Sequence, residues 1–363
     1  MNQEQFYQWQ LEIQQHFPDL KKWQTIGLAM ISYGIMKATR SQASLIAEEL
    51  VEFGKASTVE RRIQRWISNQ RITKKGLDTA WVKWIMEVYQ GQNIYLLVDE
   101  TKLSDRIGCM MISLAFRQRA IPLVWKCYRA NSKADYPEDG QVGVIVKLLK
   151  IILPVMPKDR QIVVQADRGI GNSSNLMNKI AEMGLFFLFR VKQSSVFIAD
   201  NGEQDTLGTL TPPGGTWYAE GILFTKRKIK SYVHVIWDKG QDEPWCLATN
   251  LADLAGRDYA MRVWQEESFR DLKSGGWQWQ NCLSRNPDTI DRLLLPMAIA
   301  YAWCISLGLL FYQLDETVQR QIDYVRKHVK YSIFRKGIRY FKRMFALDDE
   351  LHYFQIGPFY DFS

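Results

Sequence analysis

The spacing of hydrophobic and polar residues changes once along this chain. Residues 1–88 carry few strand signals and predict helices, among them SQASLIAEEL and STVERRIQRWISNQR. From about Asn93 the pattern becomes a series of short apolar runs rich in β-branched and aromatic residues, which are typical of buried strands. The change predicts a helical domain over residues 1–90, followed by an α/β domain.

The strand-like runs after residue 90 follow a definite order. IYLLV ends at Asp99, and CMMISLAF and AIPLVWKCY predict a hairpin joined through RQR. VGVIVKLLKIIL reads as a crossover helix that leads into QIVVQA, a parallel strand beside the first. The helix GNSSNLMNKIAEMG, which stops at Gly184, and the strand LFFLFRVK come next. We therefore expect a mixed sheet flanked by helices, with its first part at residues 91–195.

Residues 196–250 differ from the segments on either side. The turn pairs NG, PP, GG and KG separate short alternating runs, which predict antiparallel strands. This segment is interpreted as a β insertion, after which residues 251–314 return to the core.

One segment, LLLPMAIAYAWCISLGLLFYQL at residues 293–314, is long and apolar enough to span a membrane. A buried core helix packed on the sheet gives the same hydropathy, and a lone span inside such a domain makes no topological sense. We therefore predict a core helix and no membrane partner. The polar opening MNQEQFYQWQ also predicts no signal peptide.

Composition narrows the class of partner and the compartment. The chain has 363 residues, a hydrophobic fraction of 47% and a formal net charge of +8, so a polyanionic partner is plausible. Its five cysteines are scattered without a C-x-x-C pair, and its four histidines form no ligand spacing with them. Zinc and a disulfide framework are therefore not expected, and reduced thiols favour a cytoplasmic protein.

Two basic segments could contact such a partner. STVERRIQRWISNQR begins with a predicted capping box of Ser57 and Glu60, and it is similar to the second helix of a helix-turn-helix. The second basic segment lies within residues 315–363, between Arg326 and Arg343, where aromatic residues are interleaved. A charged but unoccupied surface is the alternative for both segments. The candidate DNA contacts are Arg61, Arg62, Arg65, Arg335, Lys336 and Arg339.

The most informative chemistry lies in DYAMRVWQEESFRDLKSGGW. If this stretch is one helix, its Tyr, Arg, Glu and Lys fall within an arc of about 60° on one face. These residues are Tyr259, Arg262, Glu266 and Lys273. A carboxylate flanked by cations suits a metal-binding acid beside a polyanion, although a solvated face with charge pairs gives the same pattern.

Two upstream aspartates strengthen the metal hypothesis. Asp99 and Asp167 each follow an apolar, strand-like run. Groups at the carboxyl ends of parallel strands converge, so both could meet Glu266. Three carboxylates without a structural counter-charge repel one another, and Mg²⁺ or Mn²⁺ prefers oxygen ligands. The predicted site is therefore Asp99, Asp167 and Glu266 around two such ions, an arrangement suited to phosphoryl transfer.

With these residues in place, the chain resembles a DDE transposase of the bacterial insertion-sequence type. The spacing of Tyr259, Arg262, Glu266 and Lys273 matches the Y-(2)-R-(3)-E-(6)-K signature of that family, and VDET, ADRG and EESF extend the resemblance. The resemblance implies an RNase H-like fold and a two-metal mechanism catalysed by Asp99, Asp167 and Glu266. It also implies terminal inverted repeats and target DNA as partners, and a homodimer on paired ends.

The resemblance further implies roles for individual residues. Tyr259, Arg262 and Lys273 would bind phosphates near the cleaved end. Arg190 and Lys192 would touch the DNA end, although ordinary surface charges give the same pattern. Trp245, in the insertion, would stack on a flipped base, although a tryptophan that anchors the insertion to the core fits equally well.

Two other functions remain open at this point. A related metal-dependent nuclease would cut DNA without joining it, and a non-catalytic descendant would bind DNA alone. Three neighbouring acids, Glu100, Asp105 and Glu267, complicate the assignment. Alternation along the strand turns Glu100 to the opposite face, and Glu267 falls off the signature face of the helix.

Overall fold

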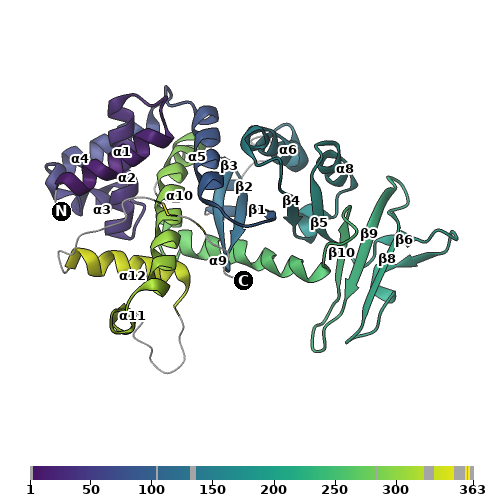
Figure 1. The fold of residues 1–363 in the computed structure, drawn as a ribbon. Coiled ribbons are helices and arrows are strands. Elements are labelled where there is room, and N and C mark those ends of the chain that lie inside the picture. The colour runs from purple at the N-terminus through teal and green to yellow at the C-terminus, as the bar shows by residue number, and fades with distance from the viewer. Residues whose placement is uncertain are drawn as a thin grey trace.

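The structure is a computed structural model that describes residues 3–103, 105–130, 136–282, 284–322, 331–346, 356–357 and 359. Figure 1 shows helices at one end of the molecule, a sheet through its middle and further strands at the other end. Helices precede strands along the chain, as the hydrophobic pattern predicts.

The N-terminal segment is helical, as predicted. Its helices are α1 (Gln3–His16), α2 (Lys22–Ala38), α3 (Ala43–Glu48), α4 (Ala56–Ser68) and α5 (Lys74–Val88), with a 3-10 turn, η1 (Val51–Phe53). They share one hydrophobic core with α10 (Pro287–Leu310), where Trp9 stacks on Trp303 with ring centroids 4.2 Å apart. The helical segment is therefore packed directly against the rest of the protein.

The start of α4 differs from the prediction. The helix begins at Ala56 after an extended Lys55, so Ser57 already lies inside its first turn and makes no cap. Glu60 instead accepts a hydrogen bond from Gln64 at 2.9 Å. The predicted capping box is therefore wrong, because the extended N-cap residue is Lys55, two residues before the Ser57 that the motif requires.

The described strands form one sheet in the order β3-β2-β1-β4-β5-β10-β9-β8-β6-β7. Its first half contains β1 (Ile94–Leu103), β2 (Ile107–Phe116), β3 (Arg119–Arg129), β4 (Ile162–Ala166) and β5 (Phe186–Val191). β1, β2 and β3 pair in antiparallel fashion, and β4 is parallel to both β1 and β5. This mixed sheet flanked by helices is consistent with the RNase H-like fold that the resemblance implies.

Asp99 lies within β1 and not at its end, which corrects the prediction. The parallel pairing with β4 stops at Val98 opposite Ala166, but the antiparallel pairing with β2 continues to Leu103. The strand is longer than its apolar run because β2 still supplies hydrogen-bond partners for its polar half.

Residues 196–250 form antiparallel strands, as predicted, and they extend the same sheet. The strands are β6 (Val196–Ile198), β7 (Gln204–Thr206), β8 (Thr216–Leu223), β9 (Ile229–Ile236) and β10 (Trp245–Thr249). β10 pairs with β5 in antiparallel fashion, so the insertion is attached to the core through backbone hydrogen bonds. Figure 1 shows its strands at the end of the molecule away from α1.

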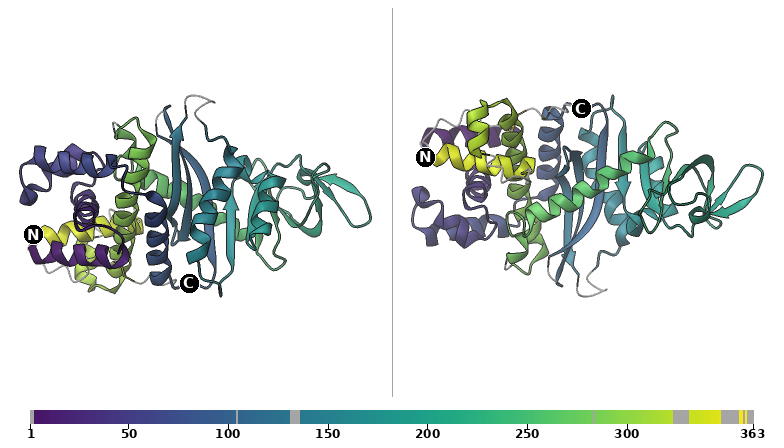
Figure 2. Two further views of the ribbon diagram at one scale, coloured as in Figure 1. Left: turned by 90° about the horizontal axis from the view of Figure 1, so that it is seen from above. Right: turned by 90° about the horizontal axis from the view of Figure 1, so that it is seen from below.

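Helices cover the two faces of the sheet. α6 (Gly140–Ile152), the predicted crossover helix, and α8 (Ser174–Glu182) lie on one face, and α9 (Val263–Leu272) crosses the other, as the two views of Figure 2 show. Alternation along β1 turns Leu97 toward Met261 and Trp264 on the α9 side. The remaining short elements are η3 (Leu153–Val155), α7 (Arg168–Gly171), η4 (Leu207–Thr209), η5 (Gly256–Arg262), η6 (Trp279–Asn281), η7 (Phe311–Gln313), α11 (Glu316–Ile322) and α12 (Ile333–Ala346).

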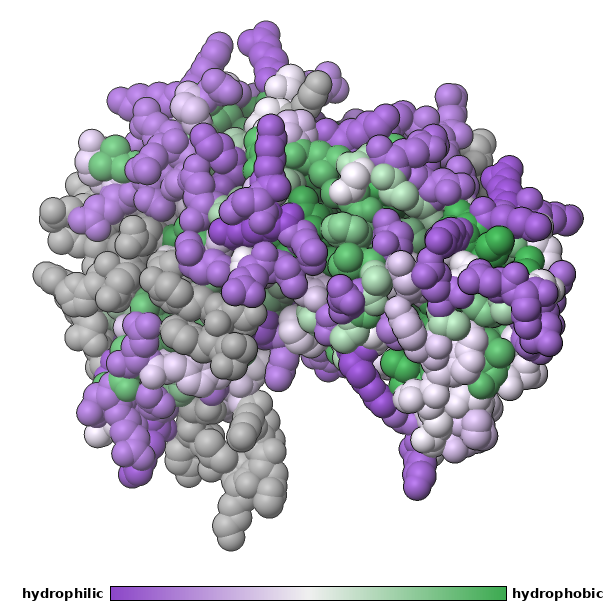
Figure 3. Space-filling model, turned by 45° about the vertical axis from the view of Figure 1, so that its right-hand side comes forward, coloured by the Kyte–Doolittle hydropathy of each residue, from purple (hydrophilic) through white to green (hydrophobic). Residues whose placement is uncertain are grey.

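The apolar helix α10 is part of the core, as predicted. Among the described residues, the segment Pro287–Gln313 is long and apolar enough to cross a membrane, but 94% of its most apolar window is buried within the protein. The face drawn in Figure 3 is mostly hydrophilic, with hydrophobic side chains gathered toward the middle of the molecule. The apolar surface of α10 is therefore used in packing.

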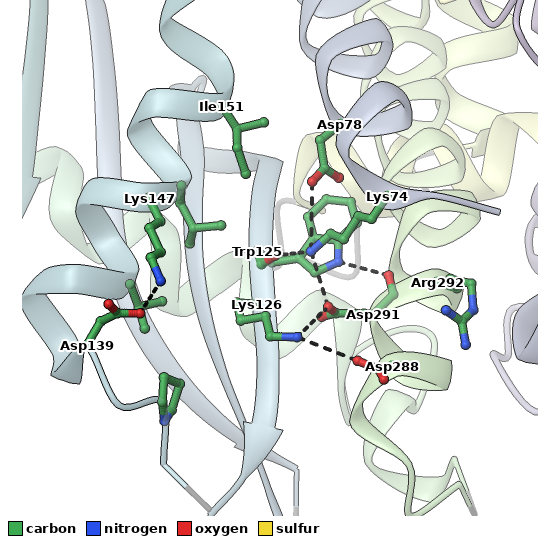
Figure 4. A pocket seen from close by; sticks show the side chains of 13 residues that line it. Lys74, Asp78, Trp125, Lys126, Asp139, Lys147, Ile151, Asp288, Asp291 and Arg292 are labelled. Carbon is green, nitrogen blue, oxygen red and sulfur yellow. Dashed lines mark hydrogen bonds and ion pairs between the residues drawn. The ribbon is translucent and has the colours of Figure 1, made fainter. Parts of the chain in front are cut away.

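A network of charged groups joins α5 and α10 to β3 beside a cavity of about 380 Å³ (Figure 4). Asp291 of α10 accepts a hydrogen bond from the Cys127 backbone at 2.6 Å and pairs with Lys74 at 3.4 Å and Lys126 at 3.7 Å. Trp125 donates its indole N–H to the Asp291 carbonyl at 2.9 Å. Because Asp291 is buried, these partners compensate its desolvation and fix α10 against the sheet.

The close approach of α12 to α10 yields a first prediction. A Cβ at Gly337 would collide with the Cys304 carbonyl oxygen of α10. Gly337→Ala is therefore expected to lower the free energy of unfolding by about 1–3 kcal/mol, as for other overpacked sites. Thermal denaturation measures the change.

The matched control is Gly76→Ala, in α5, where a Cβ has no atom within 4 Å. It should leave the melting temperature unchanged or raise it, since alanine favours a helix by up to about 1 kcal/mol over glycine. An equal response of the two variants would contradict close α10–α12 packing.

Candidate active site

Neighbouring parallel strands bring Asp99 and Asp167 to the same region. Asp99 follows Val98 on β1, Asp167 follows Ala166 on β4, and Val98 and Ala166 are paired across the ladder. Asp167 also caps the short helix α7 by accepting the Ile170 N–H at 3.0 Å. Asp99 accepts the backbone N–H of Glu100 at 2.8 Å. Both carboxylates are thus held by the backbone where the parallel pairing ends.

The segment that carries Glu266 is anchored across these strands. At its start, Asp258 accepts the Tyr95 hydroxyl of β1 at 2.6 Å, and its carbonyl accepts the Gln165 amide of β4 at 3.0 Å. Further along, Ser268 accepts the Ala120 N–H at 2.6 Å. These bonds position the turn before α9 directly over β1 and β4.

The segment is not one continuous α-helix, which corrects the helical-wheel prediction. Tyr259 and Arg262 lie in the 3-10 helix η5, Glu266 lies in α9, and Lys273 follows α9 with a non-helical ψ of −128°. The uniform rotation per residue that was used to align the four side chains therefore does not hold. Their proximity depends on the path of the chain over the sheet.

The three predicted acids converge on the guanidinium of Arg262. Its Nη2 lies 2.8 Å from Asp99 and 3.9 Å from Asp167, and its Nη1 lies 3.8 Å from Glu266. Arg262 is only 6% exposed. The acids were expected to lack a structural counter-charge, and this expectation is wrong because Arg262 supplies one.

The same arginine explains why no metal site is formed in this arrangement. Within the part of the chain that the structure describes, no group of three His, Cys, Asp or Glu side chains is placed to hold an ion. The guanidinium lies within 4 Å of an oxygen of each carboxylate, at 2.8 Å from Asp99, 3.9 Å from Asp167 and 3.8 Å from Glu266. The donor set itself is all oxygen, which is the set that Mg²⁺ and Mn²⁺ prefer.

Burial and charge act in opposite directions on Asp99. Burial raises the pKa of its carboxyl to about 6, Arg262 and the Glu100 N–H oppose that rise, and Asp167 and Glu266 add to it. The other two acids are more open, with side-chain exposures of 45% for Asp167 and 67% for Glu266. The site is therefore buried at Asp99 and open to solvent at Glu266.

Lys273 and Tyr259 occupy the two sides of this site. Lys273 donates to the Thr101 hydroxyl at 2.5 Å and to the Lys102 carbonyl at 2.8 Å, and burial lowers its pKa. Tyr259 is buried, which raises its pKa, and it packs edge-to-face on Trp245 with ring centroids 5.3 Å apart. Tyr259 thus forms part of the wall of the site.

The neighbouring acids are held elsewhere. Glu100 accepts a hydrogen bond from Gln141 of α6 at 3.1 Å on the opposite face of the sheet, as alternation predicts. Glu267 pairs with Arg270 at 2.9 Å and with Arg119 at 3.9 Å. Asp105 is exposed in the turn between β1 and β2. None of the three approaches Arg262 within ion-pair distance in the described structure.

The predicted DNA-contact residues of the core and the insertion lie near this site. Arg190 of β5 pairs with Glu243 at 2.6 Å, and Lys192 is exposed just after the same strand. Trp245 is partly buried and packs on the apolar cluster beneath η5. Its packing fits the anchoring alternative and still leaves part of the ring exposed.

The outlying basic residues separate into surface and buried groups. Arg61, Arg62 and Arg65 are exposed along α4. On α12, Arg335 is exposed and Arg339 stacks over Tyr331, but Lys336 is only 7% exposed.

The ammonium of Lys336 lies 4.6 Å from the ring centroids of both Phe311 and Tyr312, so these rings are its neighbours in the DNA-free protein, and its contact with DNA stays a prediction. Of the other basic residues in this segment, Arg326, Lys327 and Lys330 lie outside the described residues.

Two residues of the site were not singled out from the sequence. Arg168 stands beside Asp167 in the ADRG motif, so its position was a usable signal. Glu243 carried no such signal, because its approach to Arg168 depends on a contact between residues 75 positions apart.

Comparison with known families adds an independent observation. Residues 138–303 match the family model of the transposase DDE domain. This match supports a DDE transposase, and it includes Asp167, Arg262 and Glu266, while Asp99 precedes it. No curated protein matches the chain.

The raised pKa of Asp99 predicts a pH-dependent stability. Its carboxyl has a pKa of about 6 in the folded protein against an ordinary value of 3.8, so the folded state favours the protonated form. The contribution of the Asp99 carboxyl to the free energy of unfolding is therefore most favourable below about pH 4, and it is lost as the pH rises through 6. Asp99→Asn should therefore raise the melting temperature of metal-free protein at pH 8 more than at pH 4.

Thermal denaturation in a chelating buffer measures this difference. Asp105→Asn, at an exposed turn position, is the control and should shift the melting temperature equally at both pH values. A variant Asp99→Asn that behaves like the control would show that the carboxyl is not desolvated.

Proposed function

We propose that the protein is a DDE transposase that cuts DNA at the ends of a mobile element and joins those ends to target DNA. The observation that carries the proposal is the convergence of Asp99, Asp167 and Glu266 on Arg262, beside two parallel strands of the mixed sheet. The family match over residues 138–303 supports it. In this proposal Tyr259, Arg262, Glu266 and Lys273 are the Y-(2)-R-(3)-E-(6)-K signature.

The reaction class requires divalent metal, and the donor chemistry fits it. Asp99, Asp167 and Glu266 would hold Mg²⁺ or Mn²⁺, which supplies charge neutralisation at the attacking and leaving oxygens when bound. Arg262 must leave its present position for this to happen, because it now occupies the space between the three carboxylates.

Arg262 has N–H groups left over that could donate to an anionic partner. Its Nε and Nη1 are buried without a hydrogen-bond acceptor in the described structure. Buried donors of this kind are costly, and a DNA phosphate would supply the missing oxygens. We infer that Arg262 exchanges carboxylates for a phosphate when substrate binds, with Lys273 binding a neighbouring phosphate.

The chemistry then needs no covalent protein intermediate. A water oxygen forms a new P–O bond at the element end, and the 3′-oxygen leaves as a hydroxyl. That hydroxyl attacks a second phosphodiester, in target DNA or in the opposite strand, and releases another 3′-hydroxyl. The protein's part is to position and neutralise, which accounts for most of the catalysis in phosphoryl transfer.

DNA contacts away from the centre complete the proposal. The exposed arginines of α4 would bind the terminal repeat, with Arg335 and Arg339 of α12 as further phosphate contacts. Trp245, which is only partly buried, would stack on an unpaired base. We also propose a homodimer on paired ends, acting on DNA in the cytoplasm.

The central test uses oligonucleotides that carry the inverted repeats flanking the gene. Replacing Asp99, Asp167 or Glu266 with alanine should reduce both cleavage and strand transfer by about a thousandfold or more, since each is proposed to hold the ions. Gel assays with intact ends and with pre-cleaved ends measure the two steps separately.

Glu267→Gln is the matched control, since it removes the neighbouring charge on α9 and should retain activity. Cleavage without joining of pre-cleaved ends would favour the nuclease alternative. Unchanged activity in all three alanine variants would refute the catalytic assignment and leave only DNA binding.

The displacement of Arg262 predicts a measurable effect on metal binding. Arg262→Gln should bind Mn²⁺ roughly tenfold more tightly than the natural protein, because no guanidinium competes for the carboxylates. Isothermal titration calorimetry without DNA measures the affinity. Arg270→Gln removes an exposed charge from α9 and should leave the affinity unchanged. Weaker binding by Arg262→Gln would show that the arginine helps to assemble the ion site.

A further inference from the structure

One carboxylate bridges two arginines at the side of the candidate active site. Glu243, in the loop between β9 and β10, lies 2.7 and 3.0 Å from Nη1 of Arg168 and 2.6 Å from Nη2 of Arg190. The two arginines come from α7 and β5, so three separate elements meet at this point. The insertion supplies the acid, and the core supplies both cations.

This cluster adjoins the catalytic residues. Arg168 directly follows Asp167, whose carboxylate is 3.9 Å from Arg262. Arg190 is paired with Leu247 of β10, two residues beyond Trp245. An oxyanion bound by Arg168 and Arg190 would therefore lie next to the proposed metal ligands.

The cluster is accessible, and a purely structural role explains it poorly. The side-chain exposures are 45% for Arg168, 36% for Glu243 and 21% for Arg190. Ion pairs this exposed contribute little to stability. The same loop has its own closure, in which Trp237 donates to the Gln241 carbonyl at 2.9 Å and Arg257 forms two bonds of 2.7 Å to Asp238.

The arrangement of the charges matches what a phosphate requires. Two guanidinium groups share one singly charged group that has two oxygen acceptors. A DNA phosphodiester carries the same charge and also presents two non-bridging oxygens, and arginine binds both groups with the same paired geometry. Removing Glu243 would leave two neighbouring cations with no other acid bound to them in the described structure.

The resemblance already implies that Arg190 touches the DNA end. We propose that Arg168 joins Arg190 in binding a DNA phosphodiester beside the cleaved bond, and that Glu243 occupies this site in the DNA-free protein. DNA binding would release Glu243 to solvent. Glu243 and the DNA phosphate therefore compete for the two arginines, and this competition lowers the affinity for DNA. The identity of the ligand rests on the proposed function, whereas the competition by Glu243 is a property of the three side chains.

The experiment measures binding of a fluorescein-labelled mixed-sequence DNA duplex by anisotropy, in a chelating buffer and over a series of salt concentrations. Glu243→Gln should tighten binding roughly two- to fivefold, which corresponds to release from an exposed ion pair. Arg168→Ala and Arg190→Ala should each weaken binding and reduce the salt slope by about 1.

Two comparisons separate this site from a general effect of charge. Asp242→Asn removes the same charge from the same loop, at an exposed residue without an ion-pair partner in the described chain, and should give a smaller gain. Glu243→Gln should give no gain when Arg168 and Arg190 are both alanine. Equal gains for the Glu243 and Asp242 variants, or a gain that persists in the arginine-free background, would overturn the proposal.

The assay contains no metal and scores no cleavage, so its outcome is independent of catalysis. If the variants show the expected DNA affinities but the protein never cuts or joins DNA, the phosphate site is supported and the proposed transposase function is contradicted. If the protein cuts and joins DNA but the Arg168 and Arg190 substitutions leave its DNA affinity unchanged, the transposase function is supported and the phosphate site is contradicted. Circular dichroism and thermal denaturation confirm that each variant is folded.

Discussion

A single buried guanidinium holds together three carboxylates that reach the site from separate elements. Asp99 comes from β1, Asp167 from the end of β4 and Glu266 from α9, and Arg262 lies within 4 Å of each. Without a cation at this position the acids would repel one another in a partly buried site. The charge of the three carboxylates is therefore partly neutralised by a side chain of the protein itself.

A similar pairing of opposite charges lies beside the site, where Glu243 contacts Arg168 and Arg190. In both places the groups proposed to meet metal or phosphate are paired with groups of opposite charge from the protein itself. The substrate-free protein thus avoids unpaired charge, and binding becomes an exchange of partners. In the proposed function, such an exchange would favour DNA bound together with metal over either ligand alone.

The continuity of the sheet makes this exchange possible. Because β10 pairs with β5, the insertion is held in fixed register with the core, and the loop before β10 reaches Arg168 and Arg190. On the opposite side of the core, Asp291 and its lysine partners attach α10 to β3 and α5. The strands that carry Asp99 and Asp167 are therefore supported from both sides.

Local patterns in the sequence predicted the strand order, the crossover helix, the burial of α10 and the convergence of three distant acids. They succeeded because alternation and hydropathy depend on nearby residues, and this is also why Glu100 could be assigned to the opposite face from Asp99. The counter-charge at Arg262, the burial of Lys336, the length of β1 and the pairing of Glu243 with two arginines were decided only by the tertiary structure. Each depends on a partner from another element, and a charged residue has the same local signature whether it meets solvent, an aromatic ring or an opposite charge.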